Sequence, residues 1–233
     1  MIRRFPDLTI YARAVPLLVR APSVFAGPLL GAAVALVLSE AGSYLTGPIG
    51  GTGGGLFSFA ANVFYSFAFG IAIIQADALE RGIRTNFDAA WEDARRKAGG
   101  ILLAAIGFWF VVGIARYAGA LFGPGVEMLA FVAAAFFLID TIPAAAIGGL
   151  PGQYALGASI RAVRADPLGA AILAIAFVAI FVLAPDYATL AIVAHASLSD
   201  TIVQLVQAFF SAIALGYLAF PFAKQYADVA SRL

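Results

Sequence analysis

The chain has 233 residues, of which 63% are hydrophobic and only 12% are charged, with a net charge of +1. An average soluble domain carries about 25% charged residues, and a soluble globule of this length could not bury so much apolar surface in one core. The composition therefore predicts an integral membrane protein and gives no electrostatic reason to expect nucleic acid as a partner. The chain has no cysteine, which excludes disulfides, thiolate metal sites and cysteine nucleophiles.

The N-terminal segment, MIRRFPDLTIYARAVPLLVR, is basic like the first part of a signal peptide. It lacks a clear cleavage site, and Arg20 interrupts its apolar part. We therefore expect this segment to stay on the mature protein.

Six apolar stretches approach the length of about 20 residues that a membrane-spanning helix requires. They predict spans at 23–43, 56–76, 100–114 with an extension past Arg116, 126–147, 168–184 and 201–222. Each is apolar on every side, which favours helices over the alternating strands of a membrane barrel. Residues 188–196 are too few to span, so we expect them to extend the fifth helix or to lie at the interface. The predicted fold is an all-α polytopic membrane protein with six transmembrane helices in one domain, 1–233.

The distribution of basic residues predicts the orientation of the spans. Of the 14 Lys and Arg residues, all but Arg116 fall before the first span, between spans two and three, between four and five, or after the sixth. Cytoplasmic flanks of membrane helices carry an excess of Lys and Arg. We therefore predict that both termini are cytoplasmic, in the bacterial cytoplasmic (inner) membrane.

A charged segment, FDAAWEDARRKAGG, stands directly before the third span. At helical spacing, Phe87 and Trp91 fall on one face, and the other face carries charges that include Arg95 and Arg96. This pattern predicts an amphipathic helix at the membrane interface, with Asn86 as its N-cap. The two aromatic residues would face acyl chains or the helix bundle, and the arginines would face headgroups or solvent.

The same spacing occurs at 11–18 and at 156–163, each time before an apolar helix. The simplest organisation is three repeats of an amphipathic helix followed by a membrane hairpin, at 8–80, 86–150 and 155–230. The alternative is that polytopic proteins generally carry amphipathic stretches before their odd-numbered helices, because residue identity between the three units is slight.

Asp140, in the sequence AFFLIDTIPAAA, lies inside the fourth predicted span and shortly before Pro143. Ionisable residues inside membrane spans are costly and by default suggest function, and a proline can bend the helix. One interpretation is that Asp140 binds a cation or carries a proton beside a broken helix. The other is structural: the carboxyl contacts basic residues on the cytoplasmic side, pairs with a hydroxyl, or stays neutral.

Arg116 is the lone basic residue assigned to the outer side, where Glu40 and Glu127 also fall. We expect it to form an ion pair with Glu127 or with Glu40 that caps the bundle, and anion recognition is the alternative. The glycine-rich stretch GPIGGTGGG lacks the Lys-Ser/Thr of a nucleotide loop and is interpreted as an outer turn. His195 has no second His or Cys with which to form a metal site.

The stretch FDAAWEDARRKAGGILLAAIG, echoed by ALGASIRAVRADPLGAAILAIA, resembles a broad group of bacterial six-helix membrane proteins of unknown function. Some of these are distantly similar to the membrane domain of glycerophosphoryl diester phosphodiesterases. The catalytic domain of such enzymes is a separate soluble barrel, and no stretch here is long or polar enough to correspond to it. The resemblance therefore implies no catalytic residues.

We see no Ser-His-Asp set, paired catalytic carboxylates or metal-binding motif, so we expect neither an enzyme nor a cofactor. The leading hypothesis is a scaffold or accessory subunit that acts by helix packing and by contacts with membrane lipids, with a protein partner or a homo-oligomer. The alternative is a small transporter or channel-like protein that uses Asp140.

Overall fold

The structure is a computed structural model that describes residues 6–49, 51–194 and 199–232. No residue in these ranges forms a strand, which confirms the all-α class. Six helical segments are long and apolar enough to cross a membrane, so the chain is a six-helix polytopic membrane protein. The spans run over Pro22–Gly42, Gly55–Glu80, Ala98–Ala120, Pro124–Ala146, Pro167–Val193 and Asp200–Ala230.

The first span contains a 3₁₀ turn, η1, and the fourth and fifth spans are each built from more than one helical element. In chain order, the elements of the six spans are η1 (Pro22–Phe25), α2 (Ala26–Ile49), α3 (Gly51–Glu80), α5 (Ala98–Ala120), α6 (Pro124–Phe137), α7 (Thr141–Ala146), α9 (Pro167–Phe177), η2 (Val178–Leu183), α10 (Ala184–Val193) and α11 (Asp200–Ala230). The third span extends past Arg116, as expected. The fifth continues through the π-helical η2 into α10, so the apolar residues 188–193 extend this helix.

Three shorter helices precede the three membrane hairpins: α1 (Thr9–Arg20), α4 (Phe87–Arg96) and α8 (Gly152–Ala165). Each buries one face, and alanine dominates the buried faces of α4 and α8. The short side chain of alanine lets a helix approach its neighbours closely. In α4 the side chain of Asn86 accepts a hydrogen bond from the amide of Ala89 at 3.0 Å, which is the N-cap that the sequence suggested. The element order thus recurs three times, whereas the threefold sequence repeat remains a prediction.

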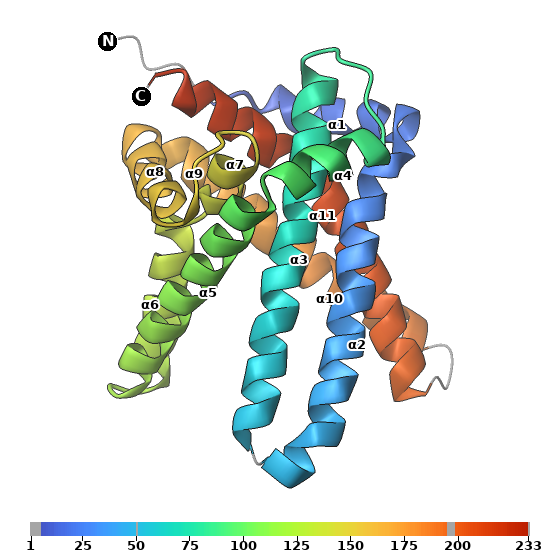
Figure 1. Ribbon diagram of the computed structural model, residues 1–233, viewed down its shortest axis with the longest axis vertical. Helices are drawn as coiled ribbons and strands as arrows, with labels where there is room; N and C mark the ends of the chain where they lie inside the picture. The colour runs from blue at the N-terminus through green and yellow to red at the C-terminus, as the bar shows by residue number, and fades with distance from the viewer. Residues whose placement is uncertain (1–5, 50, 195–198, 233) are drawn as a thin grey trace.

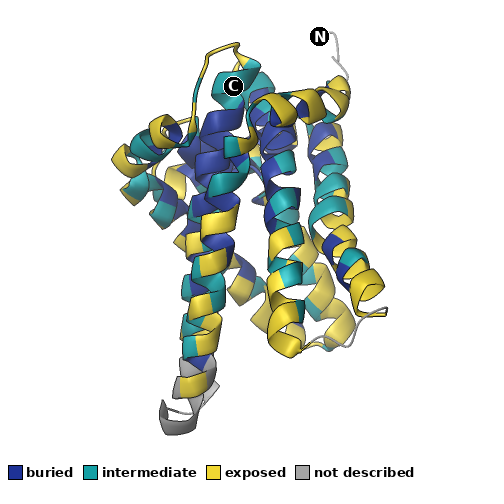
Figure 2. Ribbon diagram, turned by 90° about the vertical axis from the view of Figure 1, so that its right-hand side faces the viewer, coloured by how far each residue is buried: buried dark blue, intermediate teal, exposed yellow. Residues whose placement is uncertain are grey.

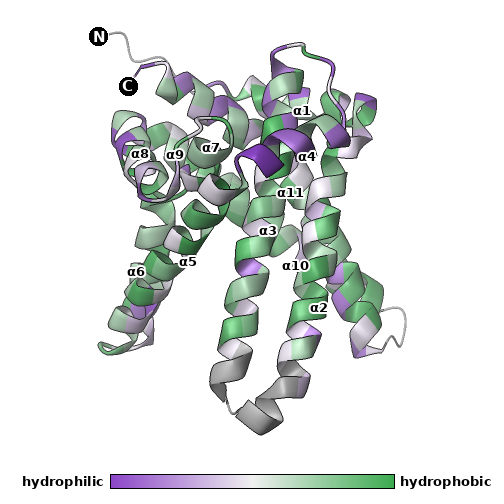
Figure 3. Ribbon diagram, in the orientation of Figure 1, coloured by the Kyte–Doolittle hydropathy of each residue, from purple (hydrophilic) through white to green (hydrophobic). Residues whose placement is uncertain are grey.

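The six spans converge at one end of the molecule (Figure 1). We call the side that holds both termini, α1, α4 and α8 the terminal side, and the opposite side, with the hairpin turns, the distal side. The three hairpins, α2–α3, α5–α6 and the one formed by η2, α10 and α11, diverge toward the distal side (Figure 1). The strongly hydrophilic segments, α4 among them, gather at the terminal side (Figure 3).

Buried residues concentrate at the terminal side (Figure 2). All six residues of α7 are buried, and α7 packs against α3, α5 and α8. In contrast, α6 and η2 contain no buried residue. The hydrophobic core therefore joins the three hairpins only at the terminal side, and their distal halves do not share it.

Candidate functional site

The fourth span is broken between α6 and α7, where Leu138 to Asp140 form turns. Pro143 has no N–H and cannot donate the helical hydrogen bond to the carbonyl of Ile139. The amide of Thr141 donates to the carbonyl of Leu138 at 3.0 Å, which is a tighter turn than that of the α-helix. Peptide groups on both sides of the break therefore lack their usual helical partners.

The hydroxyl of Ser159, on α8, bridges this break. Its Oγ donates to the carbonyl of Phe137 at 3.0 Å and accepts from the amide of Asp140 at 3.0 Å. Ser159 is completely buried, so water cannot replace these bonds. One side chain thus satisfies an orphaned carbonyl and an orphaned amide, and it ties α8 to the fourth span.

The carboxyl group of Asp140 is completely buried at the same break. Neither of its oxygens, nor the hydroxyl of Thr141, has a hydrogen-bond partner among the described residues. The titratable groups with which it interacts electrostatically are Asp166 and Tyr226, and neither is basic. Two forms of the structural interpretation, a contact with a basic residue and a hydroxyl bonded to the carboxyl, are therefore not found in the described part of the chain. Its third form, a carboxyl that stays neutral, needs no such partner.

Two cavities among the described residues both lie away from this carboxyl. A small one, of about 30 Å³, lies between the N-terminal segment, α9 and the end of α11. A larger cleft, of about 400 Å³, lies between α2, α3, η2 and α11. Neither is lined by Asp140. A cation or proton pathway that reaches Asp140 is therefore not provided by either cavity.

Lys97 binds the opposite end of α7. Its ammonium donates to the carbonyl of Ala146, in the last turn of α7, at 3.0 Å and to the carboxylate of Asp93 at 2.8 Å. A cation at a helix C-terminus is favourable because the last carbonyls carry partial negative charge. Burial raises the pKa of the Asp93 carboxyl, but the hydrogen bond and charge of Lys97, with those of Arg96, outweigh it and hold this pKa below its usual range.

The predicted interfacial anchors on α4 divide between its two faces. The ring of Trp91 lies 6.1 Å from that of Phe67 on α3 and 6.0 Å from that of Phe87, so the aromatic face packs toward the bundle. On the other face, Arg95 and Arg96 are exposed and pair with acidic residues of α4 itself, at 3.1 and 3.3 Å. These arginines are placed where headgroups or solvent would meet them.

Arg116 pairs with Glu127 at the distal side, with 2.6 Å between Nε and Oε1. The two residues lie on α5 and α6, so the ion pair closes a single hairpin. Glu40 lies on α2, which packs against α3 and α11. Of the two pairings that the sequence left open, the structure therefore forms the one with Glu127, and it does not cap the bundle as a whole.

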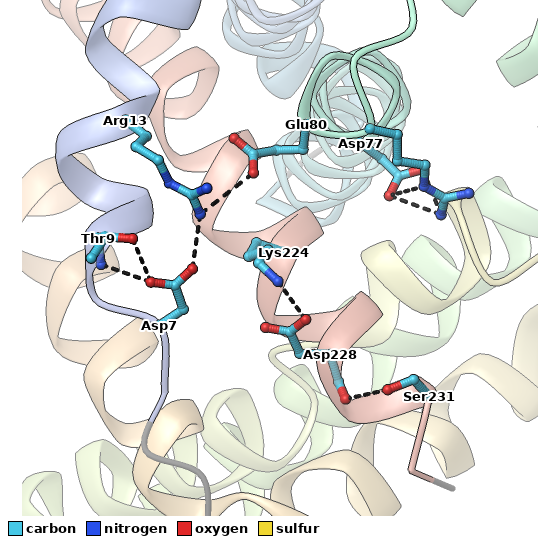
Figure 4. A network of polar contacts seen from close by, with 9 residues as sticks. Asp7, Thr9, Arg13, Asp77, Glu80, Lys224, Asp228 and Ser231 are labelled. Atoms are coloured by element: carbon cyan, nitrogen blue, oxygen red, sulfur yellow. Dashed lines mark hydrogen bonds and ion pairs between the residues drawn. The ribbon is translucent and has the colours of Figure 1, made fainter.

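A network of ion pairs on the terminal side was not apparent from the sequence (Figure 4). The guanidinium of Arg13 on α1 contacts Asp7 at 2.8 Å and Glu80 at the end of α3 at 3.7 Å. A hydrogen bond from the hydroxyl of Thr9 holds the pKa of Asp7 below its usual value. The hydroxyl of Tyr217 also donates to a backbone carbonyl of α1 at 2.7 Å. These contacts attach the N-terminal segment to the end of α3 and to α11.

Two further sequence features lie wholly or partly outside the described residues. His195 lies outside the described residues, and so does Gly50 of the stretch GPIGGTGGG. Among the residues that are described, no group of three or more His, Asp or Glu side chains is placed to hold a metal ion.

Comparisons with known proteins leave the chain without an assigned family. No family model matches it, and neither a curated protein nor a solved structure does. The resemblance to the membrane domain of glycerophosphoryl diester phosphodiesterases therefore stays a prediction.

Proposed function

We propose that this chain is a scaffold or accessory subunit of the bacterial cytoplasmic membrane, with both termini in the cytoplasm. The observation that carries the proposal is the divergence of the three hairpins from a core confined to the terminal side (Figures 1 and 2). In a membrane, the space between diverging hairpins is filled by lipids or by other helices. This architecture supports a protein that acts through lateral contacts.

The distal surfaces of the hairpins support the same proposal. Each hairpin exposes large apolar side chains, such as Val37 at 68%, Phe110 at 60% and Val182 at 43%. Association between membrane helices depends on close packing, because lipid tails are as apolar as the helices themselves. Surfaces of this kind can receive the helices of a partner protein or of a second copy.

Site-specific photo-crosslinking in cells tests the proposal. A photoreactive amino acid would replace Val37, Phe110 or Val182, one in each hairpin, and the buried Leu138 would serve as the control position. We expect a discrete protein adduct, identified by mass spectrometry, from at least one exposed position and none from Leu138. If all three hairpins gave adducts with lipids only, the scaffold proposal would be refuted.

One observation favours a second candidate, a small transporter or channel-like protein. Asp140 is completely buried beside a broken helix, and neither of its carboxyl oxygens has a described hydrogen-bond partner. Proton or cation flux into proteoliposomes would separate the two candidates. A scaffold predicts that the wild type and Asp140→Asn both match protein-free liposomes. Flux that requires Asp140 would instead establish transport.

A further inference from the structure

A cleft of about 400 Å³ separates the α2–α3 hairpin from η2 and α11. This volume falls within the range of about 300–1,000 Å³ that is usual for small-molecule sites. The cleft is open at the surface, and its lining comes from three membrane spans and the π-helical segment of a fourth. It therefore lies where a molecule dissolved in the membrane could enter it from the side.

Hydroxyl and amide groups form much of the lining, and no charged residue contributes to it. Apart from Tyr65, these polar residues are Ser39, Ser58, Asn62, Gln204, Gln207 and Ser211. Polar groups that face hydrocarbon without a partner are costly. A surface with this many neutral hydrogen-bonding groups is therefore unlike an ordinary lipid-facing helix surface.

Several of these groups have no partner among the described residues. The hydroxyl of Tyr65 is buried and has no hydrogen-bond partner among the described residues. The side-chain amides of Asn62 and Gln204 make no hydrogen bond within the described part of the chain either. Gln207 is different, because its amide donates to Asp186 on α10 at 2.8 Å. The cleft thus retains unused hydrogen-bonding capacity at several depths.

The depth and the lining of the cleft suit an elongated amphiphile. Tyr65 lies ten residues into the second span from Gly55, which is about 15 Å at the helical rise, or half of a hydrocarbon core of about 30 Å. Apart from Leu36, the apolar residues that α2 and α3 contribute to the lining are the alanines Ala32, Ala35 and Ala61. These small side chains leave room for an acyl chain beside the polar groups.

We call the residues next to the lining of the cleft its rim, and two of them are acidic. Asp186 is bonded directly to a lining residue, and Asp200 lies one helical turn before Gln204. The sole Lys or Arg of the distal segments, Arg116, is on another hairpin, where it pairs with Glu127. An anionic headgroup would therefore meet like charges at the rim, whereas a zwitterionic head can offer its ammonium to them.

We propose that this cleft is a binding site for one membrane lipid whose polar head forms hydrogen bonds and carries no net negative charge. The glycerol and ester groups of the lipid would meet the side-chain amides and hydroxyls, and one acyl chain would lie along the alanines. The proposal goes beyond the scaffold function and does not depend on it, because a transporter could hold the same lipid.

Native mass spectrometry of the detergent-purified protein tests the site. The probes are phosphatidylethanolamine and phosphatidylglycerol with identical acyl chains. We expect at least fivefold more retention of the zwitterionic lipid, and a fivefold loss of that retention in the double variant Asn62→Leu, Gln204→Leu. Gln153→Leu, which removes an exposed amide from α8 on the terminal side, should retain the lipid as the wild type does.

Equal retention of both lipids, or full retention by the double variant, would overturn the proposal. A gentler variant keeps the test valid if the double variant does not fold. The chain has no cysteine, so Ser211→Cys introduces a single and nearly isosteric thiol. Phosphatidylethanolamine should slow the reaction of this thiol with a water-soluble maleimide at least fivefold, and phosphatidylglycerol should slow it less than twofold. If phosphatidylethanolamine left the rate of the maleimide reaction unchanged, the proposed lipid site would also be overturned.

Discussion

Replacing Ser159 by alanine tests whether one hydroxyl holds the broken fourth span together. The substitution removes the donor to the carbonyl of Phe137 and the acceptor for the amide of Asp140, which both lie at 3.0 Å from Oγ. Ser159 is completely buried, so water cannot take over either bond. Alanine is close to serine in volume, so the change leaves no sizeable cavity, and the hydrogen bonds dominate its effect.

The expected loss follows from two orphaned backbone groups. A buried polar group that loses its partner costs about 1–3 kcal/mol, which gives an upper range of about 2–6 kcal/mol for two groups. Interhelical hydrogen bonds in membrane proteins average about 0.6 kcal/mol, which gives a lower bound of about 1.2 kcal/mol. We expect Ser159→Ala to lower the free energy of unfolding by about 2–3 kcal/mol.

Unfolding in mixed micelles of increasing SDS fraction, followed by the fluorescence of Trp91 and Trp109, measures this change. Ser58→Ala is the matched control, because Ser58 is exposed and makes no hydrogen bond among the described residues. The control should stay within about 0.5 kcal/mol of the wild type. A Ser159→Ala variant as stable as this control would show that the hydroxyl does not satisfy the break, and the reasoning would fail.

Three further predictions concern packing and charge. Gly31→Ala would place its Cβ 2.5 Å from the Cβ of Ala68 on α3. We therefore expect it to lower the free energy of unfolding by about 1–3 kcal/mol in the same assay. The control is Gly113→Ala, whose Cβ meets nothing within 4 Å, and it should be neutral or stabilising by up to about 1 kcal/mol. Lys97→Met removes the cation from the end of α7 and should cost about 1 kcal/mol, whereas no measurable change would exclude a role for this contact. The lowered pKa of Asp93 means that its stabilising contribution is present above its ordinary pKa of about 4 and is lost as the pH falls through the lower, folded-state value. Melting temperatures recorded down to about pH 3 should therefore fall less steeply for Asp93→Asn than for the wild type, and identical slopes would contradict the assignment.

Local patterns in the sequence were sufficient to predict much of the fold. Continuous apolar runs predicted the six spans, because a helix in lipid must satisfy its own backbone and therefore needs about 20 apolar residues in succession. Helical spacing predicted α4, and Asn86 marked its beginning, because capping depends on residues only three positions apart. Pro143 indicated a disturbed fourth helix for the same reason, since its missing N–H acts on its own turn.

Contacts between distant segments required the tertiary structure. The pairing of Ser159 with the backbone at Asp140 joins two helices, and no local pattern singles out this serine among the others. The choice of Glu127 over Glu40 by Arg116 depends on which hairpins lie together. The polar cleft assembles residues of α2, α3, η2 and α11 that are each unremarkable in sequence. Hydropathy records how apolar a segment is, whereas the packing of one helix against another decides which of its polar groups find partners and which stay available to a ligand.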